Sequence, residues 1–476
     1  MLIVILHITC VGLCILRILL RRNRQPESRL TWLVVVLVLP IIGILAYCLL
    51  GETNIGRKRA GRLAQVFNRL PRPEESLDVA QIVEPSEIDS RFKALFRVGQ
   101  AVSGYKPVSC NRANLLASTD ATIESIVADI GAAKQNVHIM FYIWLTDHNG
   151  MEVVQALKNA AARGVVCRVM VDDLGSRAMI KSQAWQDLIV AGVYVARALK
   201  IGNPLLRIFN GRIDLRNHRK IVVIDNFITY CGSQNCADAA FLPKQKYAPW
   251  VDSVMRFEGP VARQNQHLFA SDWMACVNED ISDLLLQPMP NAVPGFIAQV
   301  IGTGPTIRNS AMPEMFQTLM YAAQHEIIIT TPYYVPNAAL QAALCGAANR
   351  GVNTTIIFPK LNDDFAVGAT AKSYYEELLT AGVKIFEFRH GILHAKTMTI
   401  DSEVTLIGSA NMDRRSFDLN YENNILLHDR VTTINMRARQ FEYVANSDAV
   451  SFDDVYSWNW RQRILNNSMA ILGPVL

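Results

Sequence analysis

Hydrophobic residues are concentrated in two long runs at the start of the chain. Leu2–Leu20 is apolar except for His7 and Arg17, and Leu30–Leu50 contains no charged residue. Each run is close to the ~20 residues that a helix needs to cross about 30 Å of hydrocarbon. Because arginines follow the first run instead of preceding it, a cleaved secretory signal is disfavoured. The pattern predicts a transmembrane helical hairpin, with helices at about 2–20 and 30–50 and both ends in the cytoplasm.

After this hairpin, apolar stretches of strand length alternate with segments of helix length, and the order occurs twice. Asn136–Trp144 and Val165–Val171 in the first half correspond to Glu326–Val335 and Val352–Phe358 in the second. This alternation is typical of an α/β fold, here with two similar halves whose helix-covered mixed sheets are largely parallel. The expected divisions are the hairpin at 1–56, a basic juxtamembrane segment with a linker at 57–107, the first half at 108–277, a linker at 278–299, and the second half with the C-terminal tail at 300–476.

Two segments outside this regular order combine apolar and cationic residues. Lys200–Arg212 contains no acidic residue and has no counterpart in the second half. It predicts either a loop that enters the bilayer, with Arg207 and Arg212 at lipid phosphates, or a surface segment that docks on the core. The tail Trp458–Leu465 leaves the same two alternatives open, a membrane interface or the domain surface.

One polar pattern occurs in both halves with identical spacing, His-x-Lys-x4-Asp-x6-Gly-Ser-x-Asn. Its members are His218, Lys220, Asp225, Gly232, Ser233 and Asn235 in the first half and His394, Lys396, Asp401, Gly408, Ser409 and Asn411 in the second. Six fixed residue types at one register have a chance probability of ~10⁻⁸ if each type has a usage of roughly one in twenty. His can act as a nucleophile or proton carrier, Lys as a cation, and Ser and Asn as hydrogen-bond donors. The pattern therefore indicates phosphodiester chemistry.

The spacing also predicts how these side chains lie. Each His and its Lys are two residues apart and precede an apolar stretch, Ile221–Ile224 or Thr397–Ile400. Residues i and i+2 share one face of a β-strand, so the His and the Lys should enter a cleft together. The alternative, a His in the core, would bury the neighbouring Lys without a partner.

The duplicated pattern resembles the signature of the phospholipase D superfamily and matches it without a departure. The resemblance implies a site at the interface of the two halves, to which each half gives one His, one Lys and one Asn. One His, by the superfamily's usual preference His218, would attack phosphorus to form a phosphohistidine, and His394 would protonate the leaving alcohol. Neither a metal nor another cofactor would be required. The residues that would oppose the phosphoryl charge or donate to its oxygens are Lys220, Lys396, Asn235, Asn411, Ser233 and Ser409.

Four carboxylates accompany the signatures. Asp225 and Asp401 belong to the signatures and to the candidate catalytic set, but their place at the far end of a strand favours a structural hydrogen bond. Glu422 and Asp252 are better candidates for orienting the imidazoles, because the superfamily places an acidic residue at about this distance after each signature. Asp252 lies farther from its signature than Glu422 does.

The layout of the whole chain narrows the resemblance to bacterial membrane-bound phosphatidyltransferases of the superfamily. It implies transfer of the phosphatidyl group of phosphatidylglycerol to the hydroxyl of a second phosphatidylglycerol. The protein would lie in the bacterial inner (cytoplasmic) membrane, with its catalytic domain on the cytoplasmic side. Water or another alcohol as the acceptor, a nuclease, and an inactive lipid-binding protein are the alternatives. The intact signatures disfavour the inactive protein.

Charge and cysteine content disfavour other classes of function. The formal net charge is only +5 and is spread along the chain, whereas a nucleic-acid partner would require a basic stripe with aromatic residues. The cations of Arg57–Arg69 instead predict contact with anionic membrane lipids. Nine cysteines without close pairs favour reduced thiols over a disulfide framework. Cys231 and Cys236 lack metal-ligating neighbours, so we expect them to pack in the core.

Overall fold

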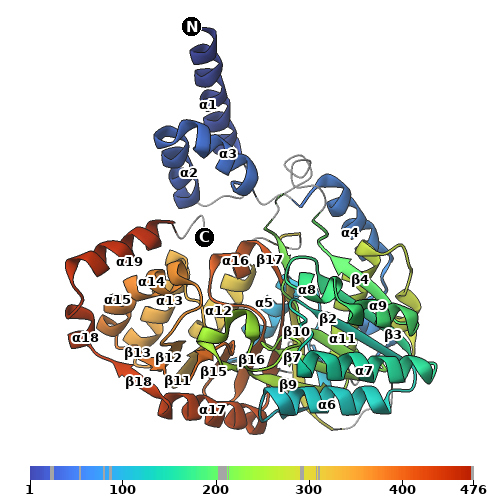
Figure 1. Ribbon diagram of the computed structural model, residues 1–476. Helices are drawn as coiled ribbons and strands as arrows, with labels where there is room; N and C mark the ends of the chain where they lie inside the picture. Colours follow the sequence, from blue (N-terminus) through green and yellow to red (C-terminus); the bar gives the residue numbers. More distant parts are fainter. Residues whose placement is uncertain are drawn as a thin grey trace.

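The computed structural model describes the chain apart from residues 22–25, 53–54, 79–80, 85–87, 202–211, 213, 290–293, 307, 309–310 and 473–476. The described residues form one sheet of sixteen strands that passes through both halves, with helices on its faces (Figure 1). The halves meet at β1 (Val108–Leu115) and β10 (Phe296–Thr303), which pair in antiparallel orientation. The two expected sheets are therefore continuous with one another.

Each half repeats the same order of elements, which confirms the prediction of an α/β fold with two similar halves. After β1, the first half contains α6 (Thr119–Ala132), β2 (Asn136–Phe141), α7 (His148–Ala162), β3 (Val166–Asp172), α8 (Arg177–Ile180), α9 (Gln183–Val190), β4 (Tyr194–Ala198), β5 (Arg216–Asn217), β6 (Ile221–Ile224), β7 (Ile228–Gly232), η4 (Leu242–Tyr247), β8 (Trp250–Val251), β9 (Val254–Glu258) and α11 (Val261–Cys276). After η5 (Ser282–Leu286) and β10, the second half contains α12 (Ala311–Ala322), β11 (Glu326–Thr330), α13 (Ala338–Asn349), β12 (Asn353–Pro359), α14 (Phe365–Ser373), α15 (Tyr375–Thr380), β13 (Lys384–Phe388), β14 (Ile392–Leu393), β15 (Thr397–Ile400), β16 (Val404–Gly408), α16 (Arg414–Asp418), β17 (Asn420–His428), α17 (Arg430–Ala445), β18 (Ser447–Val450), α18 (Phe452–Tyr456) and α19 (Trp460–Leu472).

Each half of the sheet is mixed. β2, β3 and β4 pair in parallel, as β11, β12 and β13 do, because helices provide the crossovers between them. The later strands are antiparallel, β6 with β7 and β7 with β9 in the first half, and β15 with β16 and β16 with β17 in the second. Short turns join β6 to β7 and β15 to β16. The prediction of a largely parallel sheet thus holds for only three strands in each half.

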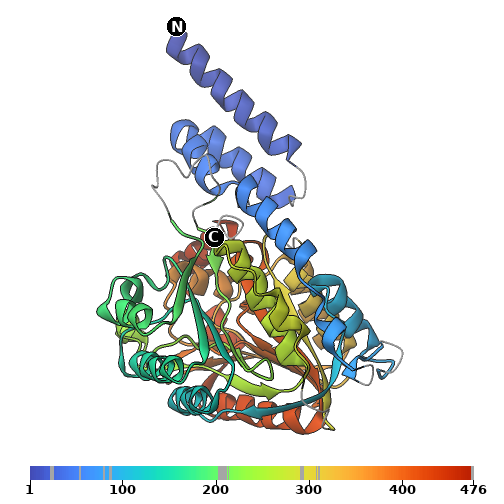
Figure 2. The ribbon, with the colours of Figure 1, turned by 90° about the vertical axis from the view of Figure 1, so that its right-hand side faces the viewer.

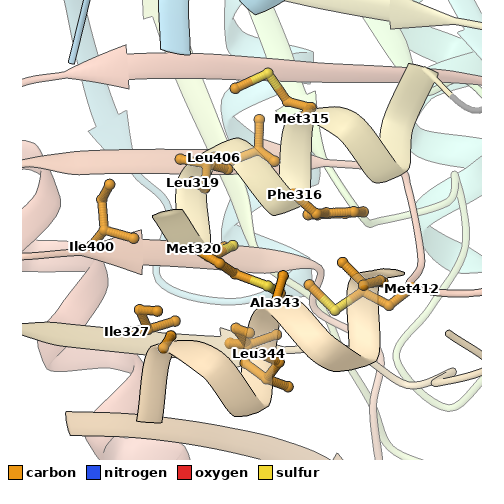
Figure 3. Packing of buried hydrophobic residues seen from close by; sticks show 14 of the residues in the cluster. Met315, Phe316, Leu319, Met320, Ile327, Ala343, Leu344, Ile400, Leu406 and Met412 are labelled. Carbon is orange, nitrogen blue, oxygen red and sulfur yellow. The ribbon is translucent and has the colours of Figure 1, made fainter. Parts of the chain in front are cut away.

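The core of the second half shows why its helices lie on the sheet. In α12, Met315, Phe316, Leu319 and Met320 recur at helical spacing and form one apolar stripe. They pack with Leu344 of α13 and with side chains from β11, β15 and β16 (Figure 3). Full burial of such a side chain stabilises the fold by ~1.5–3 kcal/mol. The apolar pattern of the helix therefore sets which of its faces meets the sheet.

The N-terminal segment departs from the predicted hairpin. α1 (Leu2–Leu20) matches the first predicted helix, but the second is divided into α2 (Pro26–Val38) and α3 (Pro40–Leu50). Pro40 explains the break, because its ring removes a backbone donor and disfavours helical angles at Leu39, whose φ is −122° and ψ 67°. Within the described part of the chain, no helix is both long enough and apolar enough to cross a membrane. α1, α2 and α3 project from one end of the body (Figures 1 and 2).

Three further elements connect these helices to the body. They are α4 (Arg57–Arg69), η1 (Pro73–Ser76) and α5 (Lys93–Ser103).

Two other segments were predicted either to touch the membrane or to dock on the protein. The first, 200–212, falls mostly outside the described residues. Arg212 is described, and its guanidinium binds Asp214 at 2.5 and 2.8 Å, which pairs it within the protein instead of leaving it for a lipid phosphate. In the tail, α19 packs on α14 and leaves Trp460 and Ile464 exposed.

Candidate active site

Each signature histidine is anchored to a strand of the other half. His218 follows β5, which pairs in parallel with β17, and its backbone N–H donates to the carbonyl of Tyr421 at 2.9 Å. His394 follows β14, which pairs in parallel with β8, and its backbone N–H donates to the carbonyl of Val251 at 2.8 Å. These pairings hold both histidines at the interface between the halves, where the superfamily resemblance placed the site.

Each histidine also binds a carboxylate that the other half supplies. Nδ1 of His218 lies 2.9 Å from Oε2 of Glu422, and Nδ1 of His394 lies 2.7 Å from Oδ1 of Asp252. Glu422 belongs to the second half and Asp252 to the first. These are the two acids expected to orient the imidazoles. Their order in the chain did not reveal that each acid binds the histidine of the other half.

Burial decides the protonation of these pairs. It lowers the pKa of both His218 and His394 to about 4, although the neighbouring carboxylates oppose the shift. Burial also acts to raise the pKa of Glu422 and of Asp252, but the histidines, the lysines and hydrogen bonds outweigh it, so both pKa values are lowered. Near pH 7 each pair is a neutral imidazole beside a carboxylate ion. Because the carboxylate carries no proton, Nδ1 must donate to it, and Nε2 keeps a lone pair that can attack phosphorus.

The two lysines lie beside the histidines and become less basic through burial. Nζ of Lys220 donates to the carbonyl of His218 at 2.9 Å, and Nζ of Lys396 donates to the carbonyl of His394 at 2.5 Å. Burial lowers the pKa of Lys220 to about 8 and that of Lys396 to about 7, and the charge of Lys220 contributes to the second shift. A phosphate anion placed between the two ammonium groups would stabilise both charges.

The signature serines bind the orienting carboxylates. Oγ of Ser233 donates to Oδ1 of Asp252 at 2.6 Å, and Oγ of Ser409 donates to Oε2 of Glu422 at 2.5 Å. The structure thus gives both hydroxyl protons to the carboxylates, which corrects the expectation that the serines donate to phosphate oxygens. Their role in this geometry is to hold each carboxylate in line with its imidazole.

The signature asparagines differ in the hydrogen bonds that their side-chain amides make. Oδ1 of Asn235 accepts from the backbone N–H of Ile143 at 3.2 Å, so Nδ2 is the group that can donate to a ligand. Oδ1 of Asn411 is buried and has no hydrogen-bond partner among the described residues. Both side chains are almost fully buried beside their signature serines, so the structure keeps them as candidate phosphate-binding groups.

Asp225 and Asp401 lie at the opposite ends of β6 and β15 from the lysines. The carboxylate of Asp225 accepts from the backbone N–H groups of 134–136 at 2.8–2.9 Å. That of Asp401 accepts in the same way from 324–326. Both residues have positive φ, 49° and 52°, a conformation that Asp adopts more readily than most residues. These contacts tie each strand end to the start of β2 or β11, which is the structural role favoured for both residues, and the strands separate them from the imidazoles.

Two aromatic rings that the sequence pattern did not single out stand against the imidazoles. The ring centroid of Tyr142 lies 4.9 Å from that of His218, and the ring centroid of Trp250 lies 4.6 Å from that of His394. Each ring covers one side of an imidazole with apolar surface and excludes water from it. Only their positions in the sequence could have indicated these rings, because Tyr142 follows an apolar strand and Trp250 precedes the candidate Asp252.

Arg219 is a charged residue of the site that the pattern also missed. It directly follows His218, is 1 % exposed, and pairs with Asp272 of α11 at 2.6 Å. Its Nε donates to the backbone carbonyl of Glu422 at 3.2 Å, so it holds the main chain of the residue that orients the first histidine. The sequence did offer a sign of this residue. The position between the signature His and Lys holds a charged arginine in the first half, whereas the second half has Ala395 there.

Removing the buried Arg219–Asp272 pair should slow turnover without unfolding the protein. The double variant Arg219→Met/Asp272→Leu leaves no unpaired buried charge, a replacement that is often neutral for stability. We expect turnover to fall by ~10–100-fold, as is typical when the support of a site residue is lost, and the acid limb of the pH–rate profile to move. Rates are measured across pH and melting curves are recorded, with the control Arg256→Met/Asp129→Leu, which removes an ion pair between β9 and α6. An unchanged rate would show that Glu422 is held without this pair.

Known proteins resemble this chain over nearly its whole length. Residues 126–273 and 316–444 match the family model described as cardiolipin synthase, PLD-like domain, and residues 11–52 match a phospholipase D-nuclease N-terminal model. The chain is 36% identical over 472 residues to cardiolipin synthase A of Erwinia tasmaniensis, which covers 97% of this chain and 95% of that protein. It is 35% identical over 470 residues to cardiolipin synthase A of Edwardsiella ictaluri, with the same two shares. The crystal structure of phosphatidylserine synthase from Haemophilus influenzae has the same fold, with a TM-score of 0.60 at 13% identity over 80% of this chain and 100% of that chain.

Proposed function

This chain belongs to the cardiolipin synthase family of phospholipase D-like phosphatidyltransferases, and we propose that it converts two molecules of phosphatidylglycerol into cardiolipin and glycerol. One observation of the structure carries the proposal. Two neutral histidines, each bound to a carboxylate of the other half, meet two lysines at the interface of the halves. Such a site can hold a phosphodiester, attack its phosphorus and deliver a proton.

In the proposed reaction, each step breaks one phosphorus bond and forms another. Nε2 of His218 attacks the phosphorus of one phosphatidylglycerol, and glycerol leaves with the proton that Nε2 of His394 takes up when the phosphate anion binds beside it. The terminal hydroxyl of a second phosphatidylglycerol then gives its proton to His394 and attacks the phosphorus, which releases His218. The proton given to glycerol in the first step is recovered from the acceptor in the second. Because one phosphodiester is exchanged for another, the reaction needs no nucleotide.

The unequal surroundings of the two carboxylates support this division of roles. In the described structure, Glu422 accepts hydrogen bonds from three side chains besides that of His218, whereas Asp252 accepts one besides that of His394. A carboxylate with fewer donors leaves more of its charge to stabilise an imidazolium. His394 is therefore the better proton carrier once a bound phosphate anion adds its own charge, and His218 is the better neutral nucleophile.

The lysine pKa values predict an alkaline limit of activity. Both lysines must be charged to oppose the charge that develops on the phosphoryl oxygens. Burial lowers the pKa of Lys396 to about 7 and that of Lys220 to about 8, so each charge is complete below its pKa and is lost as the pH rises through it. The nucleophile His218 stays neutral until the pH falls toward about 4. We therefore expect kcat/KM to fall on the alkaline side, where the lysines lose their charge and His394 loses the proton that the leaving glycerol needs.

Initial rates measured across this pH range, with phosphatidylglycerol in micelles, check the profile. Lys396→Arg should move the alkaline limb of the remaining activity to higher pH, because a guanidinium stays charged. Lys181→Arg, a change at an exposed lysine of the first half, should leave the limb in place. A profile that stays flat above the lysine pKa values would show that the lysine charges are not required.

We further propose that α1, α2 and α3 embed in the bacterial cytoplasmic membrane, with the body on its cytoplasmic side. These helices expose large apolar side chains that water would otherwise cover. They include Leu13, Leu16, Leu20, Leu30, Leu37, Val38, Ile41, Ile42 and Leu45. Ile55, which follows α3, packs against a small cluster that contains Leu419 and Tyr421, directly before Glu422. The chain that follows the three helices thus packs beside the site. A site next to the membrane would receive a lipid hydroxyl in preference to water.

Product analysis tests the proposed reaction. The purified protein is incubated in mixed micelles with phosphatidylglycerol as the only lipid, and the products are resolved by mass. Equal amounts of cardiolipin and glycerol are the expected result. Phosphatidic acid in place of cardiolipin would identify water as the acceptor and would contradict the synthase reaction, while leaving the phosphatidyl transfer chemistry intact.

A further inference from the structure

A cavity of about 470 Å³ lies in the second half between α14 and α19. Its volume falls within the range of about 300–1,000 Å³ that is typical of small-molecule sites. Phe358 and Pro359, at the end of β12, and Glu387 of β13 line it, so it opens at the carboxyl ends of parallel strands, where ligands commonly bind. No signature residue lines the cavity, and it is therefore separate from the candidate active site.

Three cations and one carboxyl group line this cavity. Lys360 is already paired with Asp448 at 2.6 Å. Lys372 of α14 and Arg461 of α19 form no ion pair within the part of the chain that the structure describes, and they approach the cavity from two different helices. Two cations around one cavity suit a phosphate group, which an arginine can bind through two N–H donors and a lysine as a point charge.

The neighbouring polar groups suit hydroxyls. Asn466 is 4 % exposed, and its Nδ2 has no hydrogen-bond partner among the described residues. A buried donor of this kind is unfavourable unless a ligand supplies an acceptor. One oxygen of Glu387 accepts from the hydroxyl of Tyr375 at 3.1 Å. The positive charges of Lys372 and Lys360 act on this carboxylate and offset part of its repulsion of an anion. Its second oxygen can bind a ligand hydroxyl.

The rim of the cavity is apolar and lies toward the N-terminal helices. Phe365 and Leu465 line the cavity and are 67 % and 37 % exposed. α19 lies at the end of the body from which α1, α2 and α3 project (Figures 1 and 2). A lipid fits this arrangement, because its headgroup can enter the cationic cavity while its chains remain at the apolar rim.

We propose that this cavity binds the headgroup of an anionic phospholipid, a phosphodiester of glycerol, outside the catalytic site. Lys372 and Arg461 bind its phosphate, and Asn466 and Glu387 bind the glycerol hydroxyls. The choice of a lipid over a soluble phosphate ester rests on the proposed function, since an enzyme that consumes phosphatidylglycerol at a membrane meets this headgroup there. A lipid held in the cavity tethers the second half to the membrane surface in addition to the N-terminal helices.

Binding of a short-chain lipid to the full-length protein tests the proposal. The protein carries His394→Ala to stop turnover, and native mass spectrometry in detergent micelles counts bound dihexanoyl phosphatidylglycerol. We expect two lipids, one in each site. Lys372→Gln/Arg461→Gln should weaken the binding of one of them by about tenfold or more. The matched control Arg112→Gln/Lys134→Gln, which removes two exposed cations of the first half, should retain both.

A second variant and two further probes separate the outcomes. Asn466→Leu removes the buried donor and keeps both cations, and it should also lose one lipid. Circular dichroism melting curves verify that each variant is folded. Equal lipid binding by the Lys372/Arg461 variant and its control would overturn the proposal. Equally tight binding of glycerol 3-phosphate or of phosphatidylethanolamine at this cavity would overturn it too, because the ligand would then be a soluble ester or any phospholipid. Cardiolipin formation is measured on the unmodified protein, so this site and the proposed function can fail separately.

Discussion

His218→Ala and His394→Ala will each remove essentially all turnover of phosphatidylglycerol. Each histidine is held by a backbone bond and a carboxylate of the other half, so the two form one site in which neither can replace the other. Losing a nucleophile or its proton carrier typically costs ~10⁴–10⁶-fold in kcat. Cardiolipin formation by mass spectrometry measures the loss, with folding verified by a melting curve.

The matched control is His148→Ala, an exposed histidine in the first turn of α7. It should retain full activity. Retention of more than a few per cent of turnover by either site variant would show that the halves work separately. In a reaction quenched with denaturant near neutral pH, where the phosphorus–nitrogen bond of a phosphohistidine survives, the label from phosphatidylglycerol should be found on the peptide that contains His218. Label on the peptide that contains His394 would reverse the proposed roles.

Glu422→Gln and Asp252→Asn should also lower turnover, though less than the loss of a histidine. An amide keeps the shape of each carboxylate but removes the negative charge that selects the Nδ1–H tautomer and stabilises an imidazolium. In a comparable carboxylate–histidine pair this change costs ~10⁴-fold, so we expect losses of ~10²–10⁴-fold here. Because Asp252 keeps fewer donors than Glu422, its variant should lose more of the proton transfer to the leaving glycerol. A substrate whose leaving alcohol is more acidic needs less help from a proton donor. It should therefore restore the turnover of Asp252→Asn more than that of Glu422→Gln.

Asp225→Asn provides the contrast within the same signature. Its carboxylate accepts three backbone N–H groups at a strand end, so the substitution should lower the free energy of unfolding by ~1–3 kcal/mol and leave turnover nearly unchanged. Thermal unfolding and initial rates on the same preparations measure the two effects. The structural role would be wrong if Asp225→Asn lost turnover as severely as Asp252→Asn while its melting temperature stayed the same.

Much of the fold was predictable because its signals are local. The alternation of strand-length with helix-length segments predicted two α/β halves, and the structure contains them. The predicted helix over 30–50 is wrong at Pro40, because proline interrupts the helix although the run of apolar residues continues through it. The continuous sheet was not predictable, since the pairing of β1 with β10 joins strands from different halves. Register between distant strands depends on packing across the whole molecule.

The sequence by itself determined which side chains we propose for the chemistry. Residues two apart on a strand share a face, so each His–Lys pair and its duplication could be recognised without coordinates. Only the tertiary structure decided that Glu422 serves His218 and Asp252 serves His394, and that the serine protons go to these carboxylates. The physical reason is that β5 pairs with β17 and β14 with β8 across the interface. Those contacts join positions far apart in the chain. The hydrophobic periodicity within each half therefore cannot predict them.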